Sequence, residues 1–198
     1  MKEFWNERYG QPVYVYGKAP NPYFAEQLKK LEKGKLLLPA EGEGRNAVYA
    51  AIKGWQVQAF DYSEVGREKA RQLADSYEVD FDYQLVKGSE FKTSDKFDAV
   101  ALIYAHFEGE ERKMLFAELE NALSPQGHLI VEVYSKNQLG KDSGGPKAVD
   151  LLYSKDEIKA LFPHVDFLIL EEAKVYLDQG SLHQGEAAVI RAVGVKNV

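Results

Sequence analysis

The chain has 198 residues, 45% of them hydrophobic, which is enough for one domain with a full core. Its net charge of -6 and pI near 5.3 argue against a protein that binds nucleic acid by broad neutralisation of phosphates. There is no cysteine, so disulfides, thiolate nucleophiles and Cys-based zinc sites are excluded. No apolar run reaches the roughly 20 residues of a membrane span, and the charged amino terminus is unlike a signal peptide. We therefore expect a soluble cytoplasmic protein.

Predicted helices and strands alternate along most of the chain. Residues 1–19 are aromatic and irregular, and we expect no regular element there. Asn21 and Pro22 predict the cap and first turn of a helix over 23–33. Strands are expected over 35–39, 55–60, 81–86, 97–104 and 128–134. Further helices are expected over 46–53, from Ser63 to about Tyr77, over 110–123 and from a capping box at 154–157.

This alternation predicts an α/β fold, a doubly wound and mostly parallel sheet of the Rossmann-like type, spanning 1–198 as a single domain. Two last strands, over 165–177 and 186–193, are separated by a loop too short for a helical crossover, so we expect them to pair antiparallel. Ligands of such sheets bind beyond the carboxyl ends of the parallel strands.

The most informative segment follows the first strand and reads Ala40-Glu41-Gly42-Glu43-Gly44-Arg45-Asn46. Nucleotide-binding domains begin with a strand, a glycine-rich turn and a helix in this order. The glycines let the backbone approach a ligand at points where a Cβ would collide with it. Glu41 and Glu43 lie where a dinucleotide site presents bare amides to a pyrophosphate. Two carboxylates repel that anion and favour a ligand with positive charge. S-adenosylmethionine has a sulfonium, an ammonium and no phosphate, so it fits.

Three further motifs occur in an order typical of one family. They are Asp61-Tyr62-Ser63, Lys96-Phe97-Asp98-Ala99-Val100 and Leu123-Ser124-Pro125-Gln126-Gly127-His128-Leu129. With the glycine-rich turn, they resemble the class I S-adenosylmethionine-dependent methyltransferases, in particular the small bacterial branch near the tellurite-resistance and thiopurine-type enzymes. The resemblance covers nearly the whole chain. It implies a seven-stranded sheet with an antiparallel last strand, and methyl transfer to a small-molecule acceptor such as a metalloid oxyanion or a thiol.

The sequence departs from the family pattern at two positions. Leu38 replaces the usual acidic residue late in the first strand, and Ala40 replaces the usual first glycine. Glu41 is a candidate substitute for the missing acid, which in the family holds the methionyl ammonium.

The resemblance assigns cofactor contacts to the loops after the first four strands. Asp61 is expected to accept the ribose hydroxyls; the alternative is an Asp that interacts with the dipole of the next helix. Tyr62 covers the adenine or packs in the core. The full predicted set is Ala40, Glu41, Gly42, Gly44, Asn46, Asp61, Tyr62, Ser63, Ser89, Glu90, Phe91 and Tyr104.

Two of the four histidines are expected at the ligand end of the sheet. His106 follows the fourth strand, where it would orient the acceptor or act as a base, and His183 lies in the last hairpin, where it would contact the acceptor. The alternatives are a structural hydrogen bond for His106 and a solvated turn for His183. No metal-ligand spacing occurs, so we expect no metal.

Residues 1–20, with Trp5, Arg8, Tyr9 and Tyr16, are a candidate lid, since closing a site expels water; the alternative is surface packing. Two other functions stay open. A NAD-dependent oxidoreductase fits Gly42-x-Gly44-x-x-Ala47, which satisfies the dinucleotide pattern. A non-catalytic S-adenosylmethionine-binding adaptor or sensor is left open by the missing acid. The acceptor and the oligomeric state stay undetermined.

Overall fold

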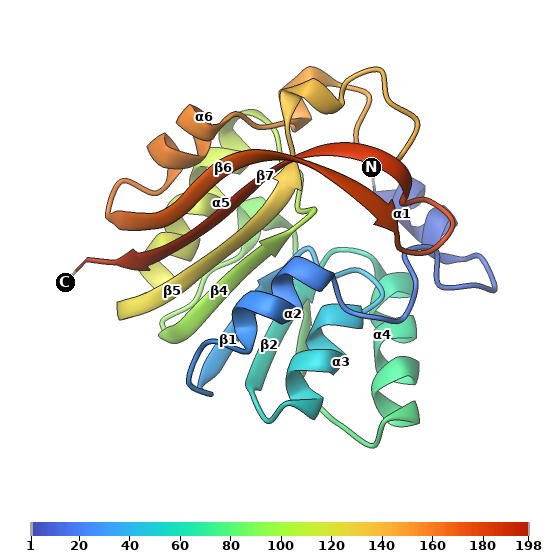
Figure 1. Cartoon of the computed structure of the whole chain (residues 1–198). Coiled ribbons are helices and arrows are strands. Elements are labelled where there is room, and N and C mark those ends of the chain that lie inside the picture. Colours follow the sequence, from blue (N-terminus) through green and yellow to red (C-terminus); the bar gives the residue numbers. More distant parts are fainter. Residues whose placement is uncertain (1, 198) are drawn as a thin grey trace.

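The computed structural model describes residues 2–197. Over these residues a seven-stranded sheet has the order β3-β2-β1-β4-β5-β7-β6 (Figure 1). The strands are β1 (Lys35–Pro39), β2 (Gln56–Asp61), β3 (Asp82–Leu85), β4 (Phe97–Ile103), β5 (Leu123–Tyr134), β6 (Val165–Asp178) and β7 (Gln184–Lys196). Strands β1 to β5 pair in parallel, and β7 pairs antiparallel with both β5 and β6. The predicted fold class is confirmed.

Helices cover both faces of this sheet (Figure 1). Helices α2 (Pro22–Leu28), α3 (Arg45–Ile52) and α4 (Glu64–Ser76) lie on one face, and α5 (Gly109–Ala122) and α6 (Lys155–Leu161) lie on the other. Helix α1 (Lys2–Tyr9) packs on α4 and lies near the β6–β7 hairpin. Three short 3₁₀ turns complete the described elements, namely η1 (Gly88–Glu90), η2 (Lys136–Gln138) and η3 (Val149–Leu151).

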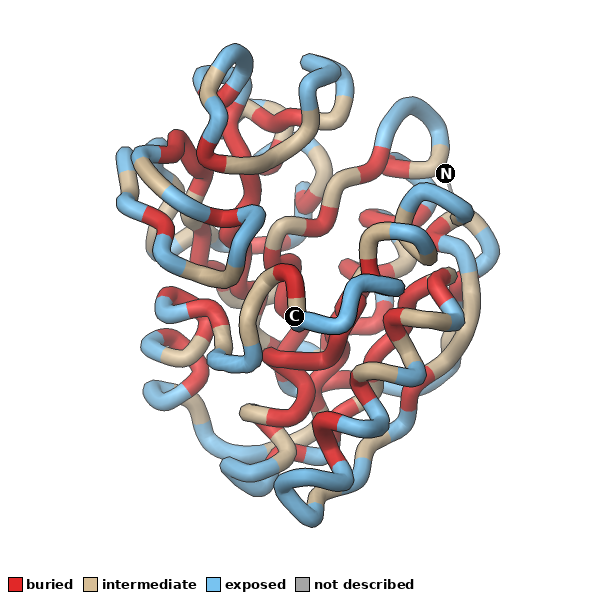
Figure 2. Tube along the Cα trace, turned by 90° about the vertical axis from the view of Figure 1, so that its right-hand side faces the viewer, coloured by how far each residue is buried: buried red, intermediate tan, exposed pale blue. Residues whose placement is uncertain are grey.

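The core has two layers, one on each face of the sheet. Leu37, in β1, packs with α5 and α6, whereas its neighbours Leu36 and Leu38 pack with α2 and α3. All three side chains are at most 1% exposed, which explains why β1 is apolar without alternation. Figure 2 shows the same pattern, with buried backbone through the middle of the molecule and exposed loops around it.

Polar caps fix the helix starts. Asn21 Oδ1 accepts from Phe24 N at 2.8 Å, and Ser63 Oγ accepts from Gly66 N at 3.0 Å. Ser154 and Glu157 form the predicted capping box. Helix α2 ends at Leu28, before the expected end at residue 33, because the following amides bond three residues back, as in a 3₁₀ turn.

Two local predictions were wrong. The segment expected to be irregular contains α1, which is stabilised within the helix by stacking of Trp5 on Tyr9, with ring centroids 5.4 Å apart, and from outside by packing on α4. Residues 124–127, which separate the expected helix over 110–123 from the expected strand over 128–134, lie within β5, as a bulge between the pairs Phe97↔Leu123 and Ala99↔His128.

Candidate active site

A cavity of about 1160 Å³ lies at the carboxyl ends of the parallel strands, where this fold binds ligands. Its wall includes Glu41 after β1, Asp61 at the end of β2, Tyr104 after β4 and Tyr134 at the end of β5. Residues of α1 and His183 of the β6–β7 hairpin complete it. The volume exceeds the roughly 300–1,000 Å³ of a typical single-ligand pocket, so it can hold a cofactor and a small second molecule together.

Most of the predicted site residues lie in this wall. They are Ala40, Glu41, Asn46, Asp61, Tyr62, Ser89, Tyr104, His106 and His183. Five others lie outside it: Gly42, Gly44, Ser63, Glu90 and Phe91. Ser63 caps α4, Glu90 is exposed, and Phe91 is a core residue stacked on Phe60 with ring centroids 4.2 Å apart.

The two glycines of the turn have a packing role. Both have positive φ, 58° at Gly42 and 84° at Gly44. A Cβ on Gly42 would lie 2.5 Å from the Tyr9 hydroxyl, and one on Gly44 would lie 2.5 Å from Ala70 Cβ in α4. The space that we expected a ligand to fill is therefore filled by α1 and α4.

Glu41 caps the helix that follows it. Its Oε1 accepts from the amides of Asn46 and Ala47, both at 2.8 Å, while Oε2 has one weak donor, Asn46 Nδ2 at 3.5 Å. Burial raises the pKa of this carboxyl to about 7, against the lowering effect of its amide donors and Arg45. The first-turn amides of α3, which would bind a pyrophosphate, are thus occupied, and Oε2 has lone pairs left for a cationic group.

Glu43 acts differently from our expectation, because its charge is neutralised inside the protein. Lys69 Nζ lies 2.5 Å from Glu43 Oε1, and the carboxylate is 2% exposed. The same ammonium donates to the carbonyls of Tyr9, Gln11 and Val13 at 3.1, 3.0 and 2.6 Å. Lys69 therefore ties the segment after α1 to α4 and to the glycine turn. Glu43 Oε2 has only one weak donor, Tyr16 N at 3.5 Å, so the ion pair with Lys69 is what distinguishes Glu43 from Glu41.

Asp61 is the acidic group at the end of β2. Its Oδ1 accepts from Ser63 N at 2.8 Å and its Oδ2 from Gly42 N at 3.2 Å. A carboxylate has about four acceptor sites, so each oxygen retains one for a ligand hydroxyl. Burial raises the pKa of Asp61 to about 6, against its amide donors. This side chain fits the diol of a ribose.

The other half of the cavity is aromatic. His183, 4% exposed, lies against three tyrosine rings, with centroids 4.5 Å from Tyr16, 4.6 Å from Tyr104 and 5.7 Å from Tyr134. Burial, and then the charge of Arg45, lower the pKa of His183 to about 3. Its Nδ1 and the Tyr134 hydroxyl are buried with no hydrogen-bond partner among residues 2–197.

His106 lies beside this group, with its ring 5.5 Å from that of Tyr134. Its Nδ1 is 2.7 Å from the carbonyl oxygen of Leu151. Burial lowers the pKa of His106 to about 4, so the imidazole is neutral at neutral pH. Its Nε2 is buried and has no protein partner within the described part of the chain.

Sequence reasoning missed several residues of the site, among them Tyr134 and Arg45 in the cavity wall and Glu132 behind Tyr104. Tyr134 ends a parallel strand at the ligand edge, and that position was a usable signal. Arg45 lines the cavity and donates to the Tyr16 carbonyl at 2.8 Å. Glu132 accepts from the Tyr104 hydroxyl at 2.9 Å and from Arg191 Nε at 2.7 Å. No local pattern indicates the last two, because their partners are distant in sequence.

Neither a membrane-spanning helix nor a metal-binding group of side chains occurs within residues 2–197. No helix within residues 2–197 is long and apolar enough to cross a membrane. In the same residues, no group of three or more His, Asp or Glu side chains is arranged to hold a metal ion.

Residues 39–127 match a family model described as a methyltransferase domain. Solved structures share the fold over nearly the whole chain. One, on the conversion of a disulfide bond into a thioacetal group during echinomycin biosynthesis, has a TM-score of 0.77 and 18% identity, and the match covers 100% of this chain and 92% of that one. TehB from Haemophilus influenzae has a TM-score of 0.74 and 12% identity, covering 99% and 67%.

The N-methyltransferase NodS from Bradyrhizobium japonicum, in complex with S-adenosyl-L-homocysteine, has a TM-score of 0.71 and 11% identity, covering 98% of this chain and 97% of NodS. No curated protein sequence matches the chain. The sheet order, the cavity at the strand ends and the family match agree with one another. The chain has the Rossmann-like fold of these methyltransferases, and residues 39–127 match a methyltransferase-domain model.

Proposed function

We propose that the protein is an S-adenosylmethionine-dependent methyltransferase that transfers the methyl group to a small-molecule acceptor. The observation that carries the proposal is that several segments of the chain cover the cavity. Residues of α1, the hairpin residue His183 and the loop with Pro146 and Lys147 all belong to its wall, from segments far apart in sequence. A site covered in this way suits a small acceptor, whereas a macromolecule needs an open trough.

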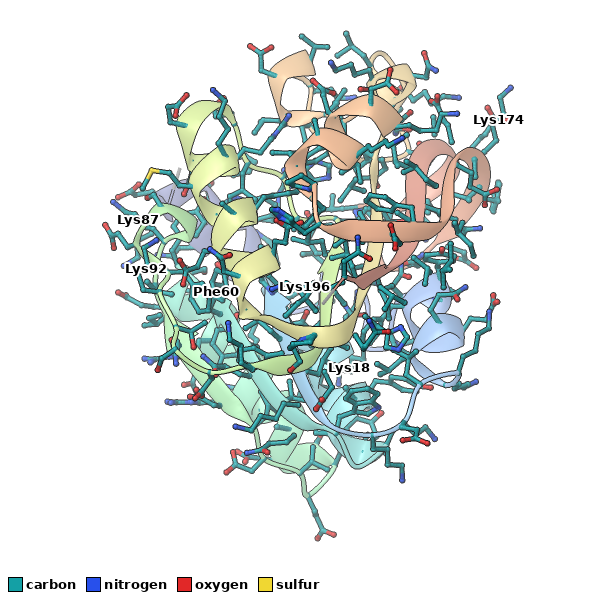
Figure 3. The ribbon with its side chains drawn as sticks, turned by 90° about the vertical axis from the view of Figure 1, so that its left-hand side faces the viewer. Lys18, Phe60, Lys87, Lys92, Lys174 and Lys196 are labelled. Atoms are coloured by element: carbon teal, nitrogen blue, oxygen red, sulfur yellow. The ribbon has the colours of Figure 1, made fainter. Side chains whose placement is uncertain are left out.

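The distribution of positive charge supports the same conclusion. Lys87, Lys92 and Lys174 are exposed, and Figure 3 shows the first two on one side of the molecule and Lys174 on the opposite side. Nucleic-acid binding at neutral pH needs a continuous basic surface, and the net charge of the chain is -6.

In this proposal the cofactor occupies the half of the cavity at the ends of β1 to β3. Asp61 accepts the ribose hydroxyls and Oε2 of Glu41 accepts the methionyl ammonium. Tyr62 and Ser89, which also line this half, contact the adenine. The cofactor supplies an activated methyl group, and the protein binds and orients it.

The amino-terminal segment is proposed to act as a lid over this half. Trp5, Arg8 and Tyr9 belong to the cavity wall, and Arg8 donates to the Tyr16 hydroxyl at 2.9 Å. Lys69 holds the chain between α1 and Tyr14 by its three carbonyl contacts. A lid that excludes water protects an alkyl transfer.

Calorimetric titration with S-adenosylhomocysteine tests the cofactor half, with binding in the micromolar range expected. Transfer of tritium from [methyl-³H]S-adenosylmethionine then tests the acceptor, using metabolite pools below 1 kDa in parallel with total tRNA and total protein. Label that enters only the small-molecule pool supports the proposal. Label that enters tRNA or protein would overturn it.

A further inference from the structure

The histidine beside the aromatic group has a fixed tautomer. The Leu151 carbonyl can only accept a hydrogen bond, so Nδ1 of His106 carries the ring proton at the 2.7 Å contact. In the neutral ring, Nε2 then has a free lone pair and no hydrogen to donate. This nitrogen is buried and lacks a partner among residues 2–197. Leaving it unpartnered costs free energy, so the site is complete only when a donor occupies it.

Two residues outside the reacting atoms hold His106 in place. The Tyr153 hydroxyl donates to the Ala105 carbonyl at 3.0 Å and accepts from Phe107 N at 3.4 Å, on either side of the histidine. Arg112 donates to the Phe107 carbonyl at 2.6 Å and lies over the Tyr153 ring, 4.1 Å from its centroid.

The same arginine also fixes the segment that supplies the Leu151 carbonyl. Arg112 Nη2 donates to the carbonyls of Asp150 at 2.5 Å and Leu152 at 3.3 Å, the two neighbours of Leu151. The peptide that sets the tautomer and the backbone that carries His106 are therefore joined through one guanidinium. Arg112 does not line the cavity.

The surroundings restrict what can bind there. Arg45 and Arg8 line the same cavity wall as His183 and His106, and their charges oppose an ammonium placed beside these rings. A deprotonated oxyanion would face the Nε2 lone pair and rings with few donors. A neutral group with an acidic hydrogen satisfies both constraints, because it donates to Nε2 and develops negative charge near the arginines.

We propose that the methyl acceptor presents a weakly acidic X–H group, a thiol or a phenolic hydroxyl, to Nε2 of His106, and that Arg112 and Tyr153 are positioning residues for this contact. The proposal rests on the proposed function. The X–H bond breaks and its proton passes to Nε2; the electron pair left on X forms the bond to the methyl carbon. The carbon–sulfur bond of the methyl donor breaks with its electron pair kept by sulfur.

The tautomer is tested on the free protein by long-range ¹H–¹⁵N NMR of a sample labelled with [¹⁵N]histidine. His106→Gln assigns the signal by its loss. We expect a protonated Nδ1 and an unprotonated Nε2. A protonated Nε2 would overturn the inference, and this result does not depend on whether S-adenosylhomocysteine binds.

The acceptor class is tested with matched probes added to the protein saturated with S-adenosylhomocysteine. Phenol and thiophenol carry an X–H, whereas anisole and thioanisole have a methyl group in its place. The first pair should shift the Nε2 resonance of His106 and bind roughly 3–10-fold more tightly, the value of one hydrogen bond. Equal binding of both pairs, or a shift produced by benzylamine alone, would overturn the proposal.

The positioning role is tested with Tyr153→Phe, which keeps the ring under Arg112 and removes only the hydroxyl. We expect a roughly 3–10-fold loss of phenol affinity and a changed Nε2 resonance, with the S-adenosylhomocysteine affinity within twofold of wild type. Tyr77→Phe, at an exposed tyrosine, is the matched control. Unchanged phenol affinity in Tyr153→Phe would contradict the role. Failure of S-adenosylhomocysteine to bind the wild-type protein would instead contradict the proposed function.

Discussion

The two halves of the cavity treat their buried polar groups in opposite ways. In the half at β1 and β2, Glu41 and Asp61 accept from backbone amides, and Glu43, whose Oε1 has no hydrogen-bond partner among residues 2–197, forms an ion pair with Lys69. In the half at β4 and β5, His106 Nε2, His183 Nδ1 and the Tyr134 hydroxyl have no hydrogen-bond partner among residues 2–197.

In the first half of the cavity the polar side chains are already held in place by the protein. In the second half a bound ligand would supply the missing hydrogen bonds. Carboxylates held by amides keep their orientation without a ligand, so little rearrangement is needed when the cofactor binds. Unpartnered nitrogens in an aromatic wall gain hydrogen bonds only when a suitable molecule arrives. Under the proposed function, the first half would set the affinity for the cofactor, and the second would select the acceptor. Four experiments test this difference.

Gly44→Ala should have the largest effect, because it breaks the packing of the first half. The new methyl group would lie 2.5 Å from Ala70 Cβ. Alanine would also have to keep the left-handed backbone conformation that Gly44 has, with φ of 84°. Overpacking costs about 1–3 kcal/mol and the conformation about 1–2 kcal/mol of unfolding free energy. Urea denaturation measures the sum of these two costs as a loss of unfolding free energy. Gly140→Ala is the control, because φ is 85° there and nothing lies within 4 Å, so only the second cost applies. Equal losses would contradict the packing role of Gly44.

Asp61→Asn tests the proposed ribose contact. The amide keeps one acceptor oxygen and the shape of the side chain, but loses the charge. S-adenosylhomocysteine affinity should fall about 10–100-fold, since hydrogen bonds to a charged group contribute about 1.5–3 kcal/mol. Calorimetry measures the change, and Glu68→Gln, at an exposed carboxylate of α4 outside the cavity wall, should leave the affinity unchanged. An Asn variant that binds normally would remove the ribose assignment.

His183→Gln tests the unpartnered half through stability. The folded-state pKa of about 3 lies below the ordinary histidine pKa of 6.5, so the contribution of His183 is complete above pH 6.5 and is lost as pH falls toward 3. Between pH 7 and 5.5 the wild type should lose about 1 kcal/mol more unfolding free energy than the Gln variant. Chemical denaturation at both pH values measures the difference. Parallel profiles would indicate a solvated His183.

Proton release on binding tests the assignment of Glu41. With a pKa of about 7, this carboxyl is about half protonated in the free protein at pH 7, and a bound ammonium would ionise it. Binding of S-adenosylhomocysteine should release about half a proton, measured by calorimetry in buffers of different ionisation enthalpy. Glu41→Gln should abolish the release. A release that persists in this variant would come from another group.

The sequence predicted the sheet and the caps because their signals are local. Apolar runs such as Leu36–Leu38 predict buried strands, and Asn21, Ser63 and Ser154 predict helix starts. The helix α1 was missed, because it has no apolar stripe and is held by ring stacking and by contacts with α4.

The sequence predicted which residues lie at the site. It did not predict their hydrogen-bond and ion-pair partners, which determine the role of each side chain. The acidic residues of the glycine turn were noticed, but the amides that occupy Glu41 and the Lys69 that neutralises Glu43 follow only from the folded chain. Likewise, the sequence places His106 after a strand, whereas its tautomer depends on Leu151, which is 45 residues away.

The cap formed by Glu41 also bears on how this fold changes cofactor. One side chain occupies the two amides at the start of α3. Glu41→Gly would expose both donors at the positive end of a helix dipole, in a turn whose glycines already have the required backbone conformation. A single codon change thus separates a pocket suited to an ammonium from one that attracts phosphate, which offers a short evolutionary or engineering route between two kinds of coenzyme.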